Sequence, residues 1–171
     1  MTAMGEAMDG FWDDRAAPER LRALPSRLLG RASSHADRLV GEALAGADAR
    51  KWHYGVLVAL REGGPGSQSE LSTRTGVHRS DLVAVINELA EQGHVERTPD
   101  PADRRRNVIT LTPQGRRHLR RLDQLVDTAQ DALLAPLSPG EREQFAAMLR
   151  RLVDHQAAAQ HAARGTARPA R

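Results

Sequence analysis

Arginine is the residue whose number and spacing could do the most chemistry in this chain. The 171 residues include 25 Lys and Arg, of which Lys51 is the only lysine. Eight arginines but only two acidic residues lie between Arg97 and Arg121. Arginine forms bidentate hydrogen bonds with phosphate, carboxylate and guanine edges. The high arginine count could reflect binding to phosphate or DNA bases, or simply an arginine-rich genome. The positions of the arginines therefore have to distinguish these two explanations.

A second group of polar residues lies on the outward face of a predicted amphipathic helix. Leu82, Val85, Ile86 and Leu89 recur at intervals of three and four and must face a core. The outward positions are then His78, Arg79, Ser80, Asp81, Ala84 and Asn87.

These outward residues match the hydrogen-bonding groups of DNA base edges. Arg79 could bond to guanine or to phosphate, Asn87 could pair with adenine, and Ala84 could touch a thymine methyl group. Asp81 could accept a bond from cytosine, orient Arg79, or simply place a negative charge in the first helical turn. The sequence leaves these roles of Asp81 open.

The composition excludes several classes of function. The chain has no cysteine, which excludes disulfides, thiolate nucleophiles and cysteine-based zinc sites. Aromatic residues make up 3% of the chain, which argues against recognition of single strands by base stacking. No apolar run approaches the roughly 20 residues that cross a bilayer, and the N-terminus has no signal-peptide pattern. We therefore expect a cytoplasmic protein without a membrane partner.

Turn and capping residues indicate the helices and strands that position the arginines between Arg97 and Arg121 and the outward residues from His78 to Asn87. Apolar spacing predicts a helix over 18–44 that is bent or interrupted at Pro25, and a second helix from about Asp48 to Glu62. The sequence from Ser67 to Glu70 has the form of a capping box, which predicts a short helix ending near Gly76.

The start of that short helix could bind phosphate through its free amides. Ser67, Gln68 and Ser69 are the candidates there, although Ser67 also serves as the helix cap. Arg74 and Thr75, near the following turn, are further phosphate candidates. The next helix starts around His78 and ends at Gly93.

The residues after Gly93 change to the pattern of strands. Segments 94–98 and 106–111 are rich in Val, Ile and Thr and flank a charged, turn-forming loop, which predicts a hairpin with a basic tip. Thr112 and Pro113 then begin a long helix, and the Ser138–Glu141 segment begins a last one. Beyond about Gln156 we expect fraying and then disorder.

This order of elements is that of a winged helix-turn-helix. We predict a mainly α (α+β) fold with helical dimerisation regions at both ends. The predicted domains are an N-terminal extension over 1–17 that could hold a short helix, a dimerisation region over 18–47 and 113–156, a DNA-binding domain over 48–112, and a disordered tail over 157–171.

Three runs of residues resemble the MarR family of bacterial transcriptional regulators. They are Asp100–Arg105 (DPADRR), Leu111–Gly115 (LTPQG) and Glu88–Arg97 (ELAEQGHVER). The resemblance covers roughly Asp48 to Val153. It implies a homodimer with interleaved terminal helices that binds double-stranded DNA, and the symmetry of a dimer predicts a near-palindromic operator. We expect a repressor, and the sequence leaves an activator open. The apolar terminal helices also need a partner layer, which a second chain or a fold-back within one subunit could supply.

The resemblance also implies roles for the loop of the predicted hairpin. Arg105 matches an arginine that enters the minor groove, and Asp103 matches an acidic residue that braces the loop. Arg104 and Arg106 would then face phosphate or solvent. Narrow grooves rich in A·T pairs attract such an arginine through their negative potential.

Members of this family commonly bind small aromatic or phenolic anions, and the resemblance implies a ligand pocket. Residues that could line it are Trp12, Trp52, His53, Tyr54, Arg116 and His118. Tyr54 could instead be a core aromatic. We do not extend the resemblance to urate, because Gly55 stands where the urate-responsive members have an acidic residue.

Other functions have weaker support. Seven histidines suggest a metal-responsive regulator, yet no two are spaced by three or four residues, so we predict no metal site. Enzyme motifs for nucleophilic serine, phosphate loops or dinucleotides are absent, so we predict neither catalysis nor a cofactor. A helical dimeric interaction module that does not touch DNA remains an alternative.

Overall fold

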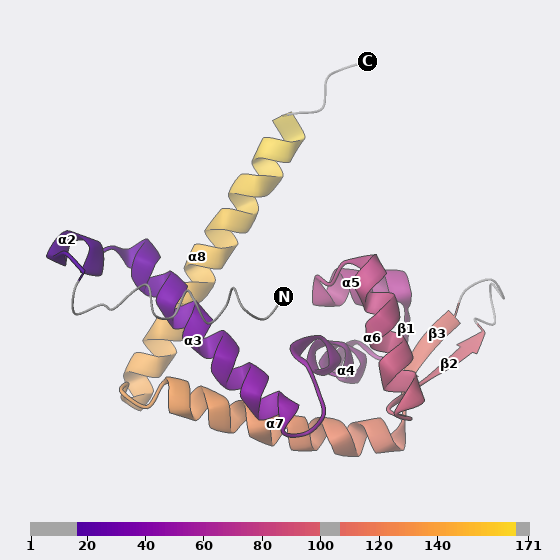
Figure 1. The fold of residues 1–171 in the computed structure, drawn as a ribbon. Coiled ribbons are helices and arrows are strands. Elements are labelled where there is room, and N and C mark those ends of the chain that lie inside the picture. The colour runs from indigo at the N-terminus through magenta and orange to yellow at the C-terminus, as the bar shows by residue number, and fades with distance from the viewer. Residues whose placement is uncertain (1–16, 100–106, 167–171) are drawn as a thin grey trace. The chain divides into compact units, whose positions relative to one another are not determined.

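A computed structural model of the chain describes residues 17–99 and 107–166. Contacts divide the chain into two compact units, Met1–Gln130 and Asp131–Arg171. The boundary falls inside a long helix. Figure 1 shows the helices and the small sheet of the first unit.

The first unit begins with two helices that meet at a proline. Helix α2 spans Glu19–Arg22 and α3 spans Pro25–Ala45. Leu24 between them has ψ 120, which is extended, because the residue before a proline is excluded from the helical region. The predicted interruption at Pro25 is confirmed.

Helix α4 spans Lys51–Gly63 and begins at Lys51, not at the predicted Asp48. Asp48 has a φ of 54, so it adopts the left-handed conformation of a turn and cannot start a helix. The helix begins after Arg50, whose backbone N–H donates to Nδ1 of His53 at 3.2 Å.

Two further helices follow, α5 over Gln68–Thr75 and α6 over Arg79–Glu91. The predicted capping box is present, because the amide of Glu70 donates to Oγ of Ser67 at 3.3 Å and the amide of Ser67 donates to Oε2 of Glu70 at 2.7 Å. Gly76 ends α5 with a φ of 70, a conformation that glycine adopts without the steric cost of a side chain.

The sheet has three antiparallel strands in the order β1-β3-β2. Strands β2 (Val95–Pro99) and β3 (Asn107–Leu111) form the predicted hairpin. Strand β1 (Gly66–Ser67) pairs with β3 and was not predicted, since two residues are too few for a periodic pattern. It joins the start of α5 to the hairpin.

Helix α7 spans Pro113–Leu133. Its side chains Leu119 and Leu122 pack in the hydrophobic core that the helices and the sheet of the first unit share. Thr112 caps the helix as predicted, because its Oγ1 accepts a bond from the amide of Gly115 at 2.9 Å. Fully buried core side chains come from α3, α4, α5, α6, β3 and α7, and they include Leu44, Leu57, Leu71, Leu82, Ile86, Leu89, Ile109, Leu119 and Leu122.

The second unit consists mainly of α8, Pro139–Thr166. Glu141 closes the predicted cap by accepting bonds from the amide and hydroxyl of Ser138 at 2.8 and 2.6 Å. The helix continues past Gln156, where the sequence predicts fraying, because its alanine-rich end favours helix without an apolar stripe. Within the described ranges, no helix has the length and apolar character to cross a membrane.

Candidate nucleic-acid interface

The predicted recognition helix α6 has the two faces that its sequence indicates. Leu82, Val85, Ile86 and Leu89 are buried. All six outward candidates are exposed, namely His78, Arg79, Ser80, Asp81, Ala84 and Asn87. Val83 is also 42% exposed, although no sequence pattern singled it out. The exposed face thus carries donors, acceptors and methyl groups that could meet base edges.

The first turn of α6 has a chain of side-chain hydrogen bonds. The hydroxyl of Ser80 donates to Oδ1 of Asp81 at 3.2 Å, and Nδ1 of His78 lies 2.9 Å from the same hydroxyl oxygen. A hydroxyl has one proton, so Nδ1 of His78 is the donor in its contact. His78 makes no side-chain bond to the helix amides.

The end of α6 is joined to the hairpin through Asn87 and Arg97. Nη2 of Arg97 donates to Oδ1 of Asn87 at 2.5 Å. Arg97 lies on β2, where it pairs with Ile109 of β3. The sequence did not identify this contact, because nothing in the local pattern relates a helix residue to a strand residue across the intervening turn.

The α5 candidates are engaged within the chain. Ser67 is buried and its hydroxyl donates to Glu70 at 2.8 Å. The hydroxyl of Thr75 donates to the carbonyl of Leu71 at 2.7 Å, and Nη1 of Arg74 donates to the carbonyl of Gly64 at 3.0 Å. Gln68 is half-buried and Ser69 is exposed. Ser69 and Arg74 are therefore the exposed members of this group of phosphate candidates.

A buried histidine connects α4 to α6. His53 is 3% exposed, and its Nε2 lies 2.8 Å from Oε2 of Glu88. Nδ1 of His53 accepts the Arg50 amide, so Nε2 carries the proton and donates to Glu88. Arg50 also forms an ion pair with Glu88. Hydrogen bonds from Arg50 and then His53 hold the pKa of Glu88 below its usual value.

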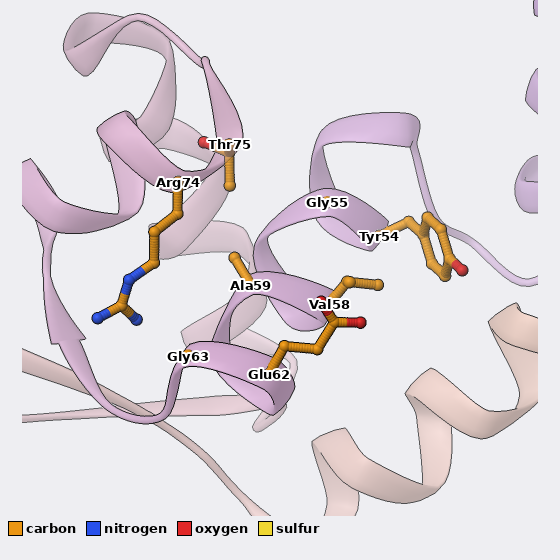
Figure 2. A pocket seen from close by; sticks show the side chains of 8 residues that line it. All are labelled: Tyr54, Gly55, Val58, Ala59, Glu62, Gly63, Arg74 and Thr75. Carbon is orange, nitrogen blue, oxygen red and sulfur yellow. The ribbon is translucent and has the colours of Figure 1, made fainter. Parts of the chain in front are cut away.

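An open hollow of about 580 Å³ lies beside α4 and α5. Its lining is Tyr54, Gly55, Val58, Ala59, Glu62, Gly63, Arg74 and Thr75. Figure 2 shows Arg74 and Tyr54 on opposite sides of Ala59. Tyr54 is the only predicted pocket residue among them. His53 faces α6 instead, and Trp52 is 52% exposed.

Tyr54 is tied to α7. Its hydroxyl donates to Oδ1 of Asp123 at 3.0 Å, and Arg61 donates to Oδ2 of Asp123 at 2.5 Å. Burial, and then the bond to Asp123, raise the pKa of Tyr54 to about 12. Tyr54 therefore keeps its proton at neutral pH and serves both the core and the rim of the hollow.

The other predicted pocket residues lie elsewhere. His118 stacks on His94, with ring centroids 4.0 Å apart and the planes at 6°, and Arg116 is exposed. Burial is the main cause that lowers the pKa of both histidines. In the parts of the chain that the structure describes, no three His, Asp or Glu residues are grouped so as to hold a metal ion.

Five of the predicted residues lie outside the described residues. They are Trp12, Asp103, Arg104, Arg105 and Arg106. The hairpin whose loop carries the last four is described up to Pro99 and from Asn107, which pair with each other.

A family model described as the MarR family matches residues 48–106. The HTH-type transcriptional repressor NicR of Pseudomonas putida is 32% identical over 99 residues, covering 58% of this chain and 63% of that protein. The multiple antibiotic resistance protein MarR of Salmonella typhimurium is 30% identical over 89 residues, covering 52% and 62%. This chain thus spans less than two thirds of the length of either relative.

Solved structures extend the similarity to most of the chain. A structure that addresses the regulation of DNA binding of Bordetella bronchiseptica BpsR by 6-hydroxynicotinic acid has a TM-score of 0.70 at 25% identity, and the match covers 81% of this chain and 99% of BpsR. The transcriptional repressor CouR bound to a 23-mer DNA duplex has a TM-score of 0.72 at 29% identity and covers 79% and 96%.

The fold and the exposed face of α6 define a winged helix-turn-helix protein, with α5 and α6 as the helix pair and β2–β3 as the wing. The family-model match over residues 48–106, the relatives and the solved structures together make this chain similar to the MarR family of transcriptional regulators. The relatives named above are transcriptional regulators and not enzymes.

Proposed function

We propose that this protein is a sequence-specific DNA-binding transcriptional regulator that acts as a homodimer, most simply as a repressor. The observation that carries the proposal is the exposed polar face of α6 beside a hairpin whose loop is rich in arginine. Helix α6 would enter the major groove while the wing reaches the adjacent backbone or minor groove. The protein would act where chromosomal DNA lies, which in bacteria is the cytoplasm.

Exposed apolar side chains on the terminal helices support the homodimer. In the first unit, Leu28 and Leu29 of α3 are 49% and 47% exposed. In the second unit, Met148, Leu152 and Val153 of α8 are 53%, 55% and 65% exposed. Such side chains cost free energy in water, roughly 25 cal/mol per Å² of apolar surface, and a second copy of the chain would cover them.

Oligomeric state tests this part of the proposal. We expect light scattering to give the mass of two chains for the native protein and of one chain for Leu152→Asp, because a carboxylate cannot be buried in an apolar interface without a partner. Ala147→Asp, at an exposed position on the opposite side of the same helix, introduces the same charge and is the matched control that should remain dimeric. A native protein that is monomeric at micromolar concentration would contradict the dimer.

Two-fold symmetry leads to a near-palindromic operator with half-sites about one helical turn apart. Arg79 and Asn87 of each subunit would contact bases, and Arg105 would enter the minor groove. Arginines around the wing would bind phosphate and release counterions, so affinity should fall steeply as the salt concentration rises.

Binding of duplex DNA tests the central part of the proposal. DNA fragments that the protein retains from its own genome would be sequenced, and the affinity for a recovered site would be measured by fluorescence anisotropy at several salt concentrations. Arg105→Ala should weaken binding, and Arg79→Ala should also change which bases are preferred. Arg120→Ala, an exposed arginine of α7, controls for the loss of one positive charge.

Two outcomes of these binding measurements would count against the proposal. Unchanged affinity in Arg105→Ala would remove the wing from the interface. A native protein that dimerises yet binds no genomic duplex at low salt would instead be a dimeric interaction module, the alternative that the sequence leaves open.

The hollow beside α4 and α5 is the proposed site for a small aromatic effector that releases DNA. Its volume of about 580 Å³ suits a small molecule. Val58 and Ala59 would contact an aromatic ring, and Arg74 could pair with a carboxylate. Release of DNA requires that the ligand bind one spacing of the recognition helices better than the other.

A hydroxylated aromatic acid tests the effector site. The probe is 6-hydroxynicotinic acid, the compound that regulates DNA binding by BpsR, and its binding would be measured by isothermal titration calorimetry. We expect Ala59→Trp to block the hollow and abolish binding, while exposed Arg120→Ala leaves it unchanged. Binding that survives Ala59→Trp would place the ligand elsewhere.

A further inference from the structure

The exposed face of α6 is apolar in its middle and polar at both ends. Val83 is 42% exposed, and its neighbour Ala84 is exposed as well. The exposed residues of the first turn, 79–81, are charged or polar, and so is Asn87 toward the other end. Two apolar side chains therefore occupy the part of the recognition helix that would lie deepest in a groove.

Val83 belongs to the row of α6 that lies beside the wing. Arg79, Val83 and Asn87 are each four residues apart, so their side chains follow one another along the same side of the helix. Asn87 accepts a hydrogen bond from Arg97 of β2 at 2.5 Å, which joins this side of the helix to the wing. A duplex that contacts α6 and the wing together would lie against this row.

Packing within the subunit does not account for Val83. In the described parts of the chain, Val83 is neither in the hydrophobic core nor among the partly buried residues that pack against it, whereas Leu82 and Val85 on either side are core residues. Valine is also a poorer helix former than alanine. The exposed part of its side chain is thus open to a partner outside the subunit.

The major groove presents an apolar group at one kind of base only. That group is the 5-methyl of thymine, since the other edges present N7, O6 and O4 acceptors and amino donors. An apolar side chain placed against a donor or an acceptor removes water from it without replacing the hydrogen bond, which costs free energy. A valine in the middle of a recognition helix therefore favours thymine.

We propose that Val83 is a specificity-determining residue that recognises the 5-methyl group of a pyrimidine, in the operator a thymine, at one position of each half-site. The proposal rests on the proposed function, since it needs α6 in the major groove. Burying one methyl group should contribute about fourfold in affinity per half-site, and about 15-fold when both half-sites are counted.

Ala84 is the competing candidate for the same methyl group. Its side chain is a single methyl close to the helix backbone, whereas Val83 carries two methyl groups farther from the helix axis. Val83 can therefore bury more of a thymine methyl than Ala84 can. A second competing role is a contact between Val83 and another protein, which would make DNA affinity independent of the thymine methyl.

Replacement of single thymines by deoxyuridine tests the proposal, because the two bases differ only in the 5-methyl group. Each thymine of a duplex recovered from the genomic selection would be replaced in turn, and the affinity measured by fluorescence anisotropy. We expect the native protein to lose about fourfold at one thymine of each half-site. Val83→Ala should lose no affinity there on replacement, while Ala84→Ser should keep the native response.

Addition of the same methyl group to cytosine gives the converse test. With cytosine at the identified position, 5-methylcytosine should raise the affinity of the native protein about fourfold, because only the methyl group is added. Val83→Ala should not respond. This variant removes no buried contact and introduces a better helix former, so its thermal unfolding temperature should equal or exceed that of the native protein.

Two results would overturn the proposal. One is a native protein that binds every deoxyuridine duplex as tightly as the thymine duplex. The other is a Val83→Ala variant that keeps the native preference for thymine over deoxyuridine, which would assign the methyl contact to another residue. Failure of the native protein to retain any duplex is a separate result, because it would contradict the proposed function itself.

Discussion

Replacing Gly115 by alanine should destabilise the protein although alanine is the better helix former. Gly115 lies in the first turn of α7, against His94, the residue that precedes the hairpin. A Cβ at this position would lie 2.0 Å from the carbonyl oxygen of His94 and 2.9 Å from its carbonyl carbon. Both atoms belong to the backbone, so no rotation of a side chain can relieve the contact.

The expected magnitude follows from two opposing terms. To restore a separation of 3.0 Å, α7 and His94 must move apart by about 1 Å, which costs about 3 kcal/mol, the upper end for overpacking. Alanine returns about 1 kcal/mol of helix propensity. The net loss is about 2 kcal/mol, which lowers Tm by about 6 °C for a chain of this length.

The same shift would strain the hydrogen bonds that join α7 to the hairpin. The amide of Thr112 donates to the carbonyl of His94 at 3.1 Å, and Oγ1 of Thr112 donates to the carbonyl of Gly93 at 2.7 Å. Thermal unfolding followed by circular dichroism at one fixed protein concentration measures the effect, since the Tm of a dimer depends on concentration.

Gly55→Ala is the matched control. Gly55 is also helical, but a Cβ there would have no neighbour within 4 Å, so alanine should raise stability by about 0.5–1 kcal/mol. A Gly115→Ala variant that melts at or above the native temperature would refute the reasoning, because the close approach of α7 to His94 would not exist.

Three further predictions concern stability. Ser67→Ala removes the cap of α5 and should cost about 1 kcal/mol in urea unfolding, and no change would mean that the cap is dispensable. Tyr54→Phe should cost about 1 kcal/mol by removing the bond to Asp123, and a stabilised variant would contradict that bond. Burial lowers the pKa of His94 and His118 in the fold, so the unfolded chain takes up protons first as pH falls below about 6.5. Stability should therefore decrease below that pH and level off once the folded histidines protonate, with a shallower decrease in His118→Gln, and stability that rises on acidification to pH 5 would be the wrong sign.

The DNA-binding elements could be predicted because their signals are local. The serine and glutamate at the start of α5, the glycine at its end and the apolar period of α6 each depend on residues within a few positions of one another. The hairpin could be predicted because the residue pattern after Gly93 changes from that of a helix to that of strands. Strand β1 gave no such signal, and its pairing with β3 depends on residues far apart in the chain.

The contacts that refine the site could not be predicted for the same reason. Glu88 meets His53 across 35 positions of sequence, and Arg97 meets Asn87 across the turn after α6. A histidine next to two aromatic residues suggests a ligand pocket, yet burial and a carboxylate on another helix give His53 a structural partner. The length of α8 was underestimated because apolar spacing, and not helix propensity, set the predicted end.

The central claim is that two copies of this chain bind one duplex through paired recognition helices and wings. The most direct measurement is the mass of the complex, by light scattering after size-exclusion chromatography, with a duplex recovered from the genomic selection. We predict two chains per duplex and no complex with a duplex of the same composition in scrambled order. A complex of one chain per duplex, or equal retention of the scrambled duplex at physiological salt, would contradict the claim.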